Sequence, residues 1–235
     1  MKINGNLVLK NMNDIYPLLA IESSDSSCGA CVYFNEEKYF SLKLILKHSH
    51  AEKLFEIIGS VLNLALITQT DLKSIALSIG PGSFTGLRIG MSAAKGIAQA
   101  LSIPIIPVPT FEALAYQISR ILPDKFLFII ANKVGRDELY FAKFQIMGNN
   151  YIFKEELKIV PLLEFSSLVK DVPVFGSVVT LDTDINIDVK NISSPDPEFI
   201  AKWATNFGLN KIISEIDFIE PNYIKDFIVK EKKYD

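Results

Sequence analysis

The chain has 235 residues, 49% of them hydrophobic, and a formal net charge of −3. This length and hydrophobic content suit one domain, or two small lobes, with a substantial buried core. The sequence lacks the clustered Lys and Arg residues that a large, self-sufficient nucleic-acid surface requires. It also lacks the uninterrupted apolar stretch of roughly 18 residues that a membrane span requires. We therefore expect a cytoplasmic protein that does not bind a membrane.

The first part of the chain predicts an antiparallel meander followed by a helix. Short turns separate three strand-like segments, at residues 18–22, 28–34 and 38–46. Ser49 and Glu52 have the spacing of a capping box, which predicts that a helix begins there. The pattern fits a deeply packed helix and equally a helix whose second apolar face meets another protein. The apolar residues of this helix are more numerous than a single core-facing stripe needs: Leu54, Phe55, Ile57, Ile58, Val61 and Leu62.

Cys28 and Cys31 have the C-x-x-C spacing of redox and zinc sites, but both lie in a predicted strand. An odd offset in a strand directs two side chains to opposite faces, whereas redox pairs sit at the start of a helix. His48 and His50, the only histidines, are closer together than the roughly three to five residues that separate zinc-finger histidines. No acid or nucleophile near them indicates catalysis. We expect two reduced thiols and no metal ion, cofactor or catalytic residue.

A glycine-rich stretch spans residues 78–101 and contains Gly80, Gly82, Gly86, Gly90 and Gly96. Its spacing matches neither the phosphate loop Gly-x-x-x-x-Gly-Lys-Ser/Thr nor the dinucleotide loop Gly-x-Gly-x-x-Gly. A loop before a helix still presents free amide groups that attract anions. The stretch alone therefore gives little support for nucleotide binding.

The later glycines of this stretch recur on one side of a predicted helix. Gly86, Gly90 and Ala94 are four residues apart, and Ala93 and Ile97 lie on the same side. Each glycine costs the helix about 1 kcal/mol relative to Ala, so the pattern needs a compensating contact. One interpretation is close packing onto the protein's own sheet. The other, which we favour, is a flat exposed face against which a second helix packs closely.

The same order of elements occurs twice, starting near residue 18 and near residue 126. Each copy has a strand, a polar loop, a strand, a turn, a strand and a helix, which indicates two related lobes. We expect an α/β protein in which each lobe is a mixed sheet with flanking helices. The expected divisions are an N-terminal extension at residues 1–16, a first lobe at 17–109 and a reduced second lobe at 110–235. Further elements are predicted as strands at 74–79, 103–108, 126–131, 138–144 and from 151, and as helices from Thr110, at 162–169 and at 196–207, the last with Pro197 in its first turn and Gly208 after it.

The glycine-rich stretch resembles the signature of the bacterial TsaB (YeaZ) family. This family belongs to the actin-like, ribonuclease H-like superfamily of two-lobed folds that includes Hsp70. Glu22 stands where the family usually has Asp, and Asn132-Lys133-Val134 replaces its usual Asp-Ala-Arg. Shorter similarities follow the family's order from about residue 17 to 225, at residues 19–24, 48–49, 138–140 and 221–224. The signature itself comprises Gly80, Pro81, Gly82, Ser83, Phe84, Thr85, Gly86, Leu87, Arg88, Ile89 and Gly90.

The resemblance implies a non-catalytic scaffold. TsaB-like proteins bind the catalytic subunit TsaD, with the ATPase TsaE joining, to attach a threonylcarbamoyl group to the adenosine beside the anticodon of certain tRNAs. The scaffold then meets tRNA only through the complex. The family's docking surface is a helical bundle from the first two helices of each subunit. Carried to this chain, the resemblance implies these interface residues: Ala51, Leu54, Phe55, Ile58, Leu62, Gly86, Gly90, Ala93, Ala94 and Ile97.

Two further expectations follow. The exposed docking face predicts a homodimer when the protein is isolated, because uncovered apolar patches associate. The alternative function is a metal- or ATP-dependent enzyme of the same fold, either a kinase or a peptidase. Glu22 and Asp25 are the only candidate acids for its phosphate loop.

Overall fold

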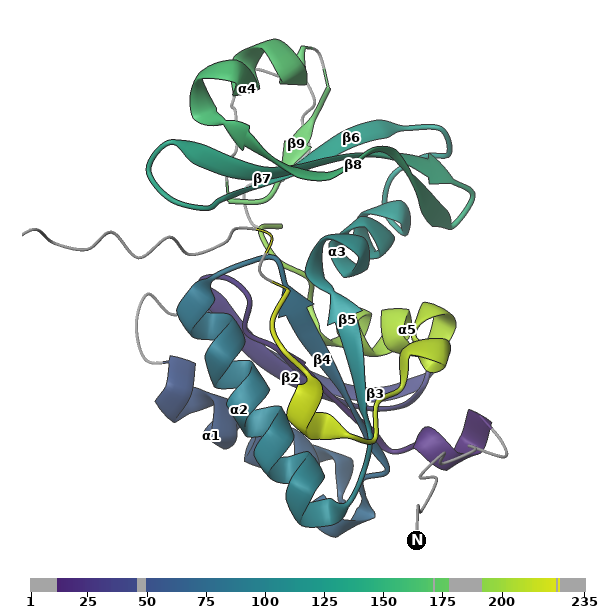
Figure 1. Ribbon diagram of the computed structural model, residues 1–235. Helices are drawn as coiled ribbons and strands as arrows, with labels where there is room; N and C mark the ends of the chain where they lie inside the picture. The colour runs from purple at the N-terminus through teal and green to yellow at the C-terminus, as the bar shows by residue number, and fades with distance from the viewer. Residues whose placement is uncertain (1–11, 46–49, 171, 178–191, 223, 225–235) are drawn as a thin grey trace, which may run out of the picture.

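The computed structural model describes residues 12–45, 50–170, 172–177, 192–222 and 224. Two sheets lie one above the other, and helix α3 lies between them (Figure 1). The predicted α/β architecture of two lobes is confirmed. Its helices are α1 (His50–Ala65), α2 (Phe84–Leu101), α3 (Thr110–Ser119), α4 (Leu162–Val169) and α5 (Pro197–Phe207), with short 3₁₀ turns η1 (Met12–Ile15), η2 (Gln69–Asp71), η4 (Leu209–Lys211) and η5 (Ile216–Phe218).

The sheet of the first lobe has the strand order β3-β2-β1-β4-β5. The first three strands pair antiparallel, as the predicted meander requires, and β4 and β5 add in parallel. Every residue of β1 is buried, which explains its continuous apolar run. The strands are β1 (Leu18–Glu22), β2 (Ser27–Asn35), β3 (Lys38–Ile45), β4 (Ser74–Gly80) and β5 (Ile105–Pro109).

The sheet of the second lobe repeats the meander and has the order β8-β7-β6-β9. Strands β6, β7 and β8 pair antiparallel, and β9 adds in parallel. Helix α4 follows β8, so the repeat that the sequence predicts is present in the described residues. The strands are β6 (Leu127–Lys133), β7 (Glu138–Met147), β8 (Asn150–Pro161) and β9 (Val174–Phe175).

Helices cover both faces of the first sheet. On one face, α1 and α2 bury Ile57 and Met91 in a core with Leu19 and Ile21 of β1. On the other face, α5 packs against the sheet through side chains such as Trp203. Cys28 belongs to the first of these cores and Cys31 to the second, and both thiols are free. The predicted opposite orientation of the two cysteines is confirmed.

The second lobe is smaller than the sequence predicts, which corrects the assignment of all of residues 110–235 to it. Helix α5 has the predicted ends, with Pro197 at its start and Gly208 as its C-cap, but it packs on the first sheet. Beyond it, Ile213 exchanges two backbone hydrogen bonds with Ile105 of β5, of 3.0 and 2.9 Å. The chain therefore enters the second lobe after α3 and returns to the first before α5.

Tyr151 of β8 links the two lobes at the point where α3 and α5 meet. Its hydroxyl accepts a hydrogen bond from Trp203 Nε1 (2.9 Å) and donates one to Glu112 Oε2 of α3 (2.8 Å). Burial raises the pKa of the Tyr151 hydroxyl, so the group stays protonated and keeps both roles. Three elements from two lobes thus share one hydroxyl group.

Replacing Tyr151 by Phe is expected to lower the free energy of unfolding by about 1–3 kcal/mol, because the buried indole N–H of Trp203 loses its acceptor. Urea denaturation measures this change. Tyr39→Phe, at an exposed position of β3, is the control and should change little. Equal stability of the two variants would contradict the linking role of Tyr151.

Candidate functional site

The glycine-rich stretch joins the end of β4 to the first turns of α2. Gly80 closes the strand with a φ of +109°, a left-handed conformation that favours glycine. Ser83 is the N-cap of α2, and its hydroxyl accepts a hydrogen bond from the amide of Gly86 (3.2 Å). The stretch is thus a tight turn into an 18-residue helix.

The loop after β1 lies directly against these glycines. The amide of Ser83 donates to the carbonyl of Ser24 (2.6 Å), and the Ser23 hydroxyl donates to the carbonyl of Gly86 (2.9 Å). An added Cβ at Gly82 would overlap the Ser24 carbonyl oxygen, and one at Gly86 would overlap the Ser23 carbonyl oxygen. The glycines therefore admit the protein's own loop.

This contact corrects the predicted docking role of Gly86 and Gly90. Gly90 is buried, and an added Cβ there would overlap the Ser23 hydroxyl and approach Leu77 of β4. The interpretation that we favoured from the sequence is wrong for this side of α2, which faces inward.

Most of the other predicted interface residues are also part of the protein's own core. Five of them are buried in the core against the first sheet: Leu54, Ile58, Leu62, Ala93 and Ala94, of which Ala93 also borders an open surface. Ile97 is half-buried and packs against the same core. The side chain of Ala51 lies outside the described residues, as do His48 and Ser49. Phe55 and Ala93 are the two predicted interface residues that line an open surface.

That surface is a groove between α1 and α2 with a volume of about 510 Å³. The Phe55 side chain of α1 is 59% exposed on it. Arg88 of α2 stacks over the Phe84 ring, with its guanidinium carbon 3.8 Å from the ring centre. The groove is mainly apolar and is lined by Phe55, Phe84, Thr85, Arg88, Ile89, Ser92 and Ala93.

Two helical glycines, one in α1 and one in α2, have open space beside them among the described residues. An added Cβ at Gly59 of α1 or at Gly96 of α2 would meet nothing within 4 Å. Each nevertheless costs its helix about 1 kcal/mol relative to Ala. Gly59 was not among the residues singled out from the sequence, and Gly96 was assigned no role there. Gly96 follows Ser92 by four residues on the exposed side, and this spacing was the available signal.

Glu22 lies at the end of β1, next to the loop that covers the glycines. Its carboxyl group is fully buried, and its Oε1 atom accepts hydrogen bonds from the amide (2.6 Å) and the hydroxyl of Ser24. Burial raises the pKa of this carboxyl above its usual range, while the bonds from Ser24, the Ser78 hydroxyl and the charge of Lys43 lower it in part. The Oε2 atom of Glu22 has no hydrogen-bond partner among the described residues.

The described residues contain neither a cluster of metal-binding side chains nor a helix that could cross a membrane. Within them, no three His, Cys, Asp or Glu side chains come close enough together to hold a metal ion. None of their helices has the length and apolar character needed to cross a membrane.

The two kinds of glycine are expected to respond oppositely to substitution. Gly86→Ala should lower the free energy of unfolding by about 1–3 kcal/mol, because its Cβ displaces the Ser23 loop. Gly96→Ala should raise it by up to about 1 kcal/mol, because Ala is the better helix former and finds open space. Urea denaturation of both variants measures these changes, and the reverse order would contradict the assignment of inner and outer faces.

Glu22→Gln is expected to stabilise the protein at neutral pH. Burial makes the pKa of Glu22 higher in the folded than in the unfolded protein. The contribution of protonated Glu22 to the free energy of unfolding is therefore fully present below about pH 4.3, the ordinary pKa of Glu. It is lost as the pH rises through the folded pKa. Glutamine keeps an acceptor for Ser24 and has no charge to bury. Unfolding free energies of parent and variant should therefore diverge as pH rises from 4 to 8, and parallel curves would contradict a raised pKa.

Comparison with known proteins identifies the family of this chain. The family model described as TsaD, tRNA N6-adenosine threonylcarbamoyltransferase, matches residues 44–160. A relative from Buchnera aphidicola of Schizaphis graminum, named tRNA threonylcarbamoyladenosine biosynthesis protein TsaB, is 32% identical over 158 residues, covering 67% of this chain and 72% of the relative. The Bacillus subtilis protein of the same name is 35% identical over 98 residues, covering 42% of this chain and 43% of its own.

A solved structure supports the two-lobed fold. It is a Pseudomonas aeruginosa protein described as uncharacterised, with similarity to peptidase YeaZ. It superposes with a TM-score of 0.68 over 88% of this chain and 99% of its own, at 21% identity. The expected fold is thus confirmed by structure, and the expected family by sequence. The chain belongs to the TsaB (YeaZ) family of tRNA threonylcarbamoyladenosine biosynthesis proteins.

Proposed function

We propose that this protein is the non-catalytic scaffold of a tRNA threonylcarbamoyltransferase complex and docks a TsaD-like catalytic subunit in the groove between α1 and α2. The observation that carries the proposal is the pairing of an exposed Phe55 with the unfilled space beside Gly59 and Gly96. Burying an aromatic side chain favours association, and glycines let a partner helix come close. A TsaD-type partner agrees with the family to which the chain belongs.

The loop beside the glycine-rich stretch supports a scaffold over an enzyme. In a phosphate-binding protein, the amides at the start of such a helix are free to bind an anion. Here the amide of Ser83 binds the carbonyl of Ser24, and the amide of Gly86 binds the Ser83 hydroxyl. Glu22, a candidate acid for a phosphate loop, is sealed inside the fold. Two of the amides at this helix start therefore already have partners within the protein.

The proposal extends to the rest of the assembly. A TsaE-like ATPase joins the complex, and the scaffold meets tRNA only through it, in keeping with a net charge of −3 and the absence of a basic run. Without a TsaD-like subunit, the same groove pairs with a second copy, because exposed apolar patches associate. The complex works in the cytoplasm.

Reconstitution tests the proposed function. The purified chain, a TsaD-like subunit and a TsaE-like ATPase are combined with tRNA and the threonylcarbamoyl donor, and tRNA modification is measured with each protein left out in turn. Omitting this chain should abolish turnover, while the chain alone should hydrolyse neither ATP nor a peptide substrate. ATP hydrolysis by the isolated chain would favour the kinase alternative. Light scattering over a concentration series tests the homodimer.

Phe55→Ala is expected to weaken docking of the TsaD-like subunit by about 2 kcal/mol or more, because truncating a central interface aromatic removes much of the binding energy. Its thermal unfolding should change little, since the side chain is mostly exposed. Calorimetric titration measures the affinity. Leu163→Ala, an exposed apolar position on α4 of the second lobe, is the matched control. Unchanged affinity of Phe55→Ala would place docking elsewhere.

A further inference from the structure

We propose that the C-terminal segment 214–220 forms a second wall of the docking face and that Phe218, with the carboxylates around it, binds a basic side chain on the docked helix of the TsaD-like subunit. The inference rests on the proposed function and adds the chemistry that the partner must present. Three observations support this inference: the exposed position of Phe218, the course of the segment beside α2, and the negative charge of the segment.

Phe218 is presented on a fixed support. Its side chain is 81% exposed, although Ile216 and Ile219 beside it are buried in the core under α1 and α2. The segment is held to α2 by a hydrogen bond from Lys95 Nζ to the carbonyl of Asp217 (3.0 Å). Its far end is held by the amide of Asn222, which donates to the carbonyl of Ile79 (2.7 Å). A large aromatic side chain held this way in water is a candidate for burial by a partner.

The segment lies on the opposite side of α2 from α1. Phe55 of α1 borders α2 along Ile89 and Ala93, whereas the segment borders it along Lys95 and Gln99. Helical periodicity places Ser92 and Gly96 between these two edges. Figure 1 shows the yellow C-terminal segment running beside α2. Between its two edges, α2 therefore exposes the small residues Ser92 and Gly96, with Phe55 on the α1 side and the segment that carries Phe218 on the other.

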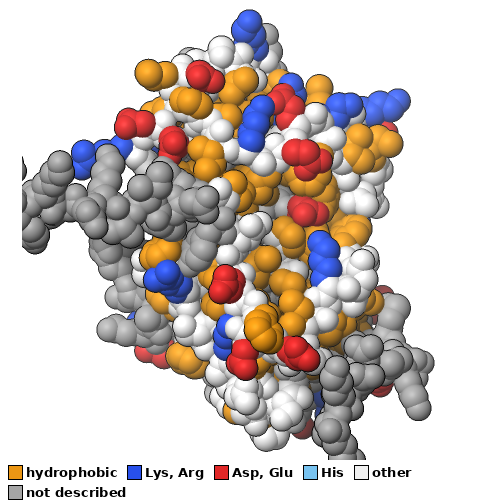
Figure 2. Space-filling model, viewed as in Figure 1, with side chains coloured by type: hydrophobic (Ala, Val, Ile, Leu, Met, Phe, Trp, Pro, Cys, Tyr) orange, Lys and Arg blue, Asp and Glu red, His pale blue; other side chains and the backbone are white. Residues whose placement is uncertain are grey.

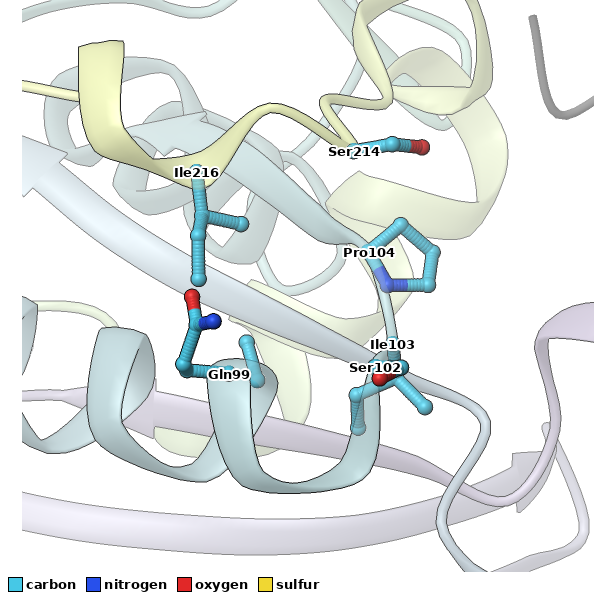
Figure 3. Close-up of a pocket in the computed structure, with 7 residues that line it drawn as sticks. Gln99, Ser102, Ile103, Pro104, Ser214 and Ile216 are labelled. Carbon is cyan, nitrogen blue, oxygen red and sulfur yellow. The ribbon is translucent and has the colours of Figure 1, made fainter. Parts of the chain in front are cut away.

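A small cavity lies between the segment and the C-terminal end of α2. Its volume is about 210 Å³, and Ser214 and Ile216 of the segment line it opposite Gln99, Ser102 and Pro104 (Figure 3). The cavity lies open beside the segment that carries Phe218. A helix seated on α2 would thus find both an aromatic surface and a recess at this end.

The charge of the segment selects the partner's chemistry. Glu215, Asp217 and Glu220 are exposed around Phe218, and residues 212–222 contain no Lys or Arg. Acidic side chains gather with apolar ones on this part of the surface (Figure 2). Three carboxylates outnumber the ammonium of Lys95 at this end of the face, so they would repel an acidic side chain there, while the Arg88 guanidinium stacks on Phe84 in the groove beside Phe55. A Lys or Arg side chain of the partner would lie over the Phe218 ring and pair with a carboxylate.

The experiment measures affinity of the full-length chain for the TsaD-like subunit by calorimetry at low and high salt. Phe218→Ala should bind about tenfold more weakly at both salt concentrations. The double variant Asp217→Lys with Glu220→Lys should bind at least about tenfold more weakly at low salt and approach the parent at high salt, since salt screens exposed charges. Matched controls are Leu163→Ala on α4 and Glu156→Lys on β8, both exposed in the second lobe. Melting temperatures of all variants should equal that of the parent.

Failure of this inference differs from failure of the proposed function. If the parent does not bind, the proposed function and the inference both fall. If the parent binds and both segment variants bind within about twofold of the controls, the inference alone is overturned and docking is confined to the α1–α2 groove. Tighter binding by the double lysine variant would also overturn it, because the facing surface would then be acidic.

Discussion

The contact between the Ser23–Ser24 loop and the first turns of α2 determines which face of α2 turns toward the interior of the first lobe. Two hydrogen bonds tie the loop to the helix, one at the amide of Ser83 and one at the carbonyl of Gly86. The loop can come this close to α2 only because positions 82, 86 and 90 are glycine. These glycines therefore let one face of α2 turn inward. The opposite face, and with it the groove against α1, is then presented to the solvent.

The sequence could predict that α2 carries glycines for a close approach, but not which side of the helix meets what. Gly86–Gly90–Ala94 and Ser92–Gly96–Ala100 have the same four-residue spacing, and periodicity alone does not distinguish them. The difference lies in the surroundings: the first series faces Ser23 and Leu77, whereas Gly96 faces open space. The same limit applies to α1, for which periodicity left two interpretations open. Of the α1 residues that the resemblance assigned to the interface, Leu54, Ile58 and Leu62 are buried and Phe55 is exposed.

The elements themselves were predictable because their signals are local. Strand β1 and helix α4 have the predicted ends, and Pro197 and Gly208 bound α5 as expected. The placement of α5 was not predictable, because its apolar face would fit either lobe. The deciding factor is packing between residues distant in sequence: Trp203 lies in the same buried core as Leu18 and Ile106. The return of the chain also places the segment with Phe218 beside α2, a neighbour more than a hundred residues earlier.

The chemistry of the loop connects the fold to the proposed scaffold role. At the start of a helix, free amides and the helix dipole favour an anion, and the Ser24 carbonyl here satisfies the Ser83 amide as an uncharged substitute. A phosphate entering this place would have to displace a backbone that is anchored on both sides, and would approach a buried carboxyl at Glu22. Phosphate binding on the inner face of α2 would therefore require displacement of this loop, whereas the outer face retains unfilled space beside Gly96. One helix thereby separates the face that stabilises the fold from the face that we propose as the docking surface.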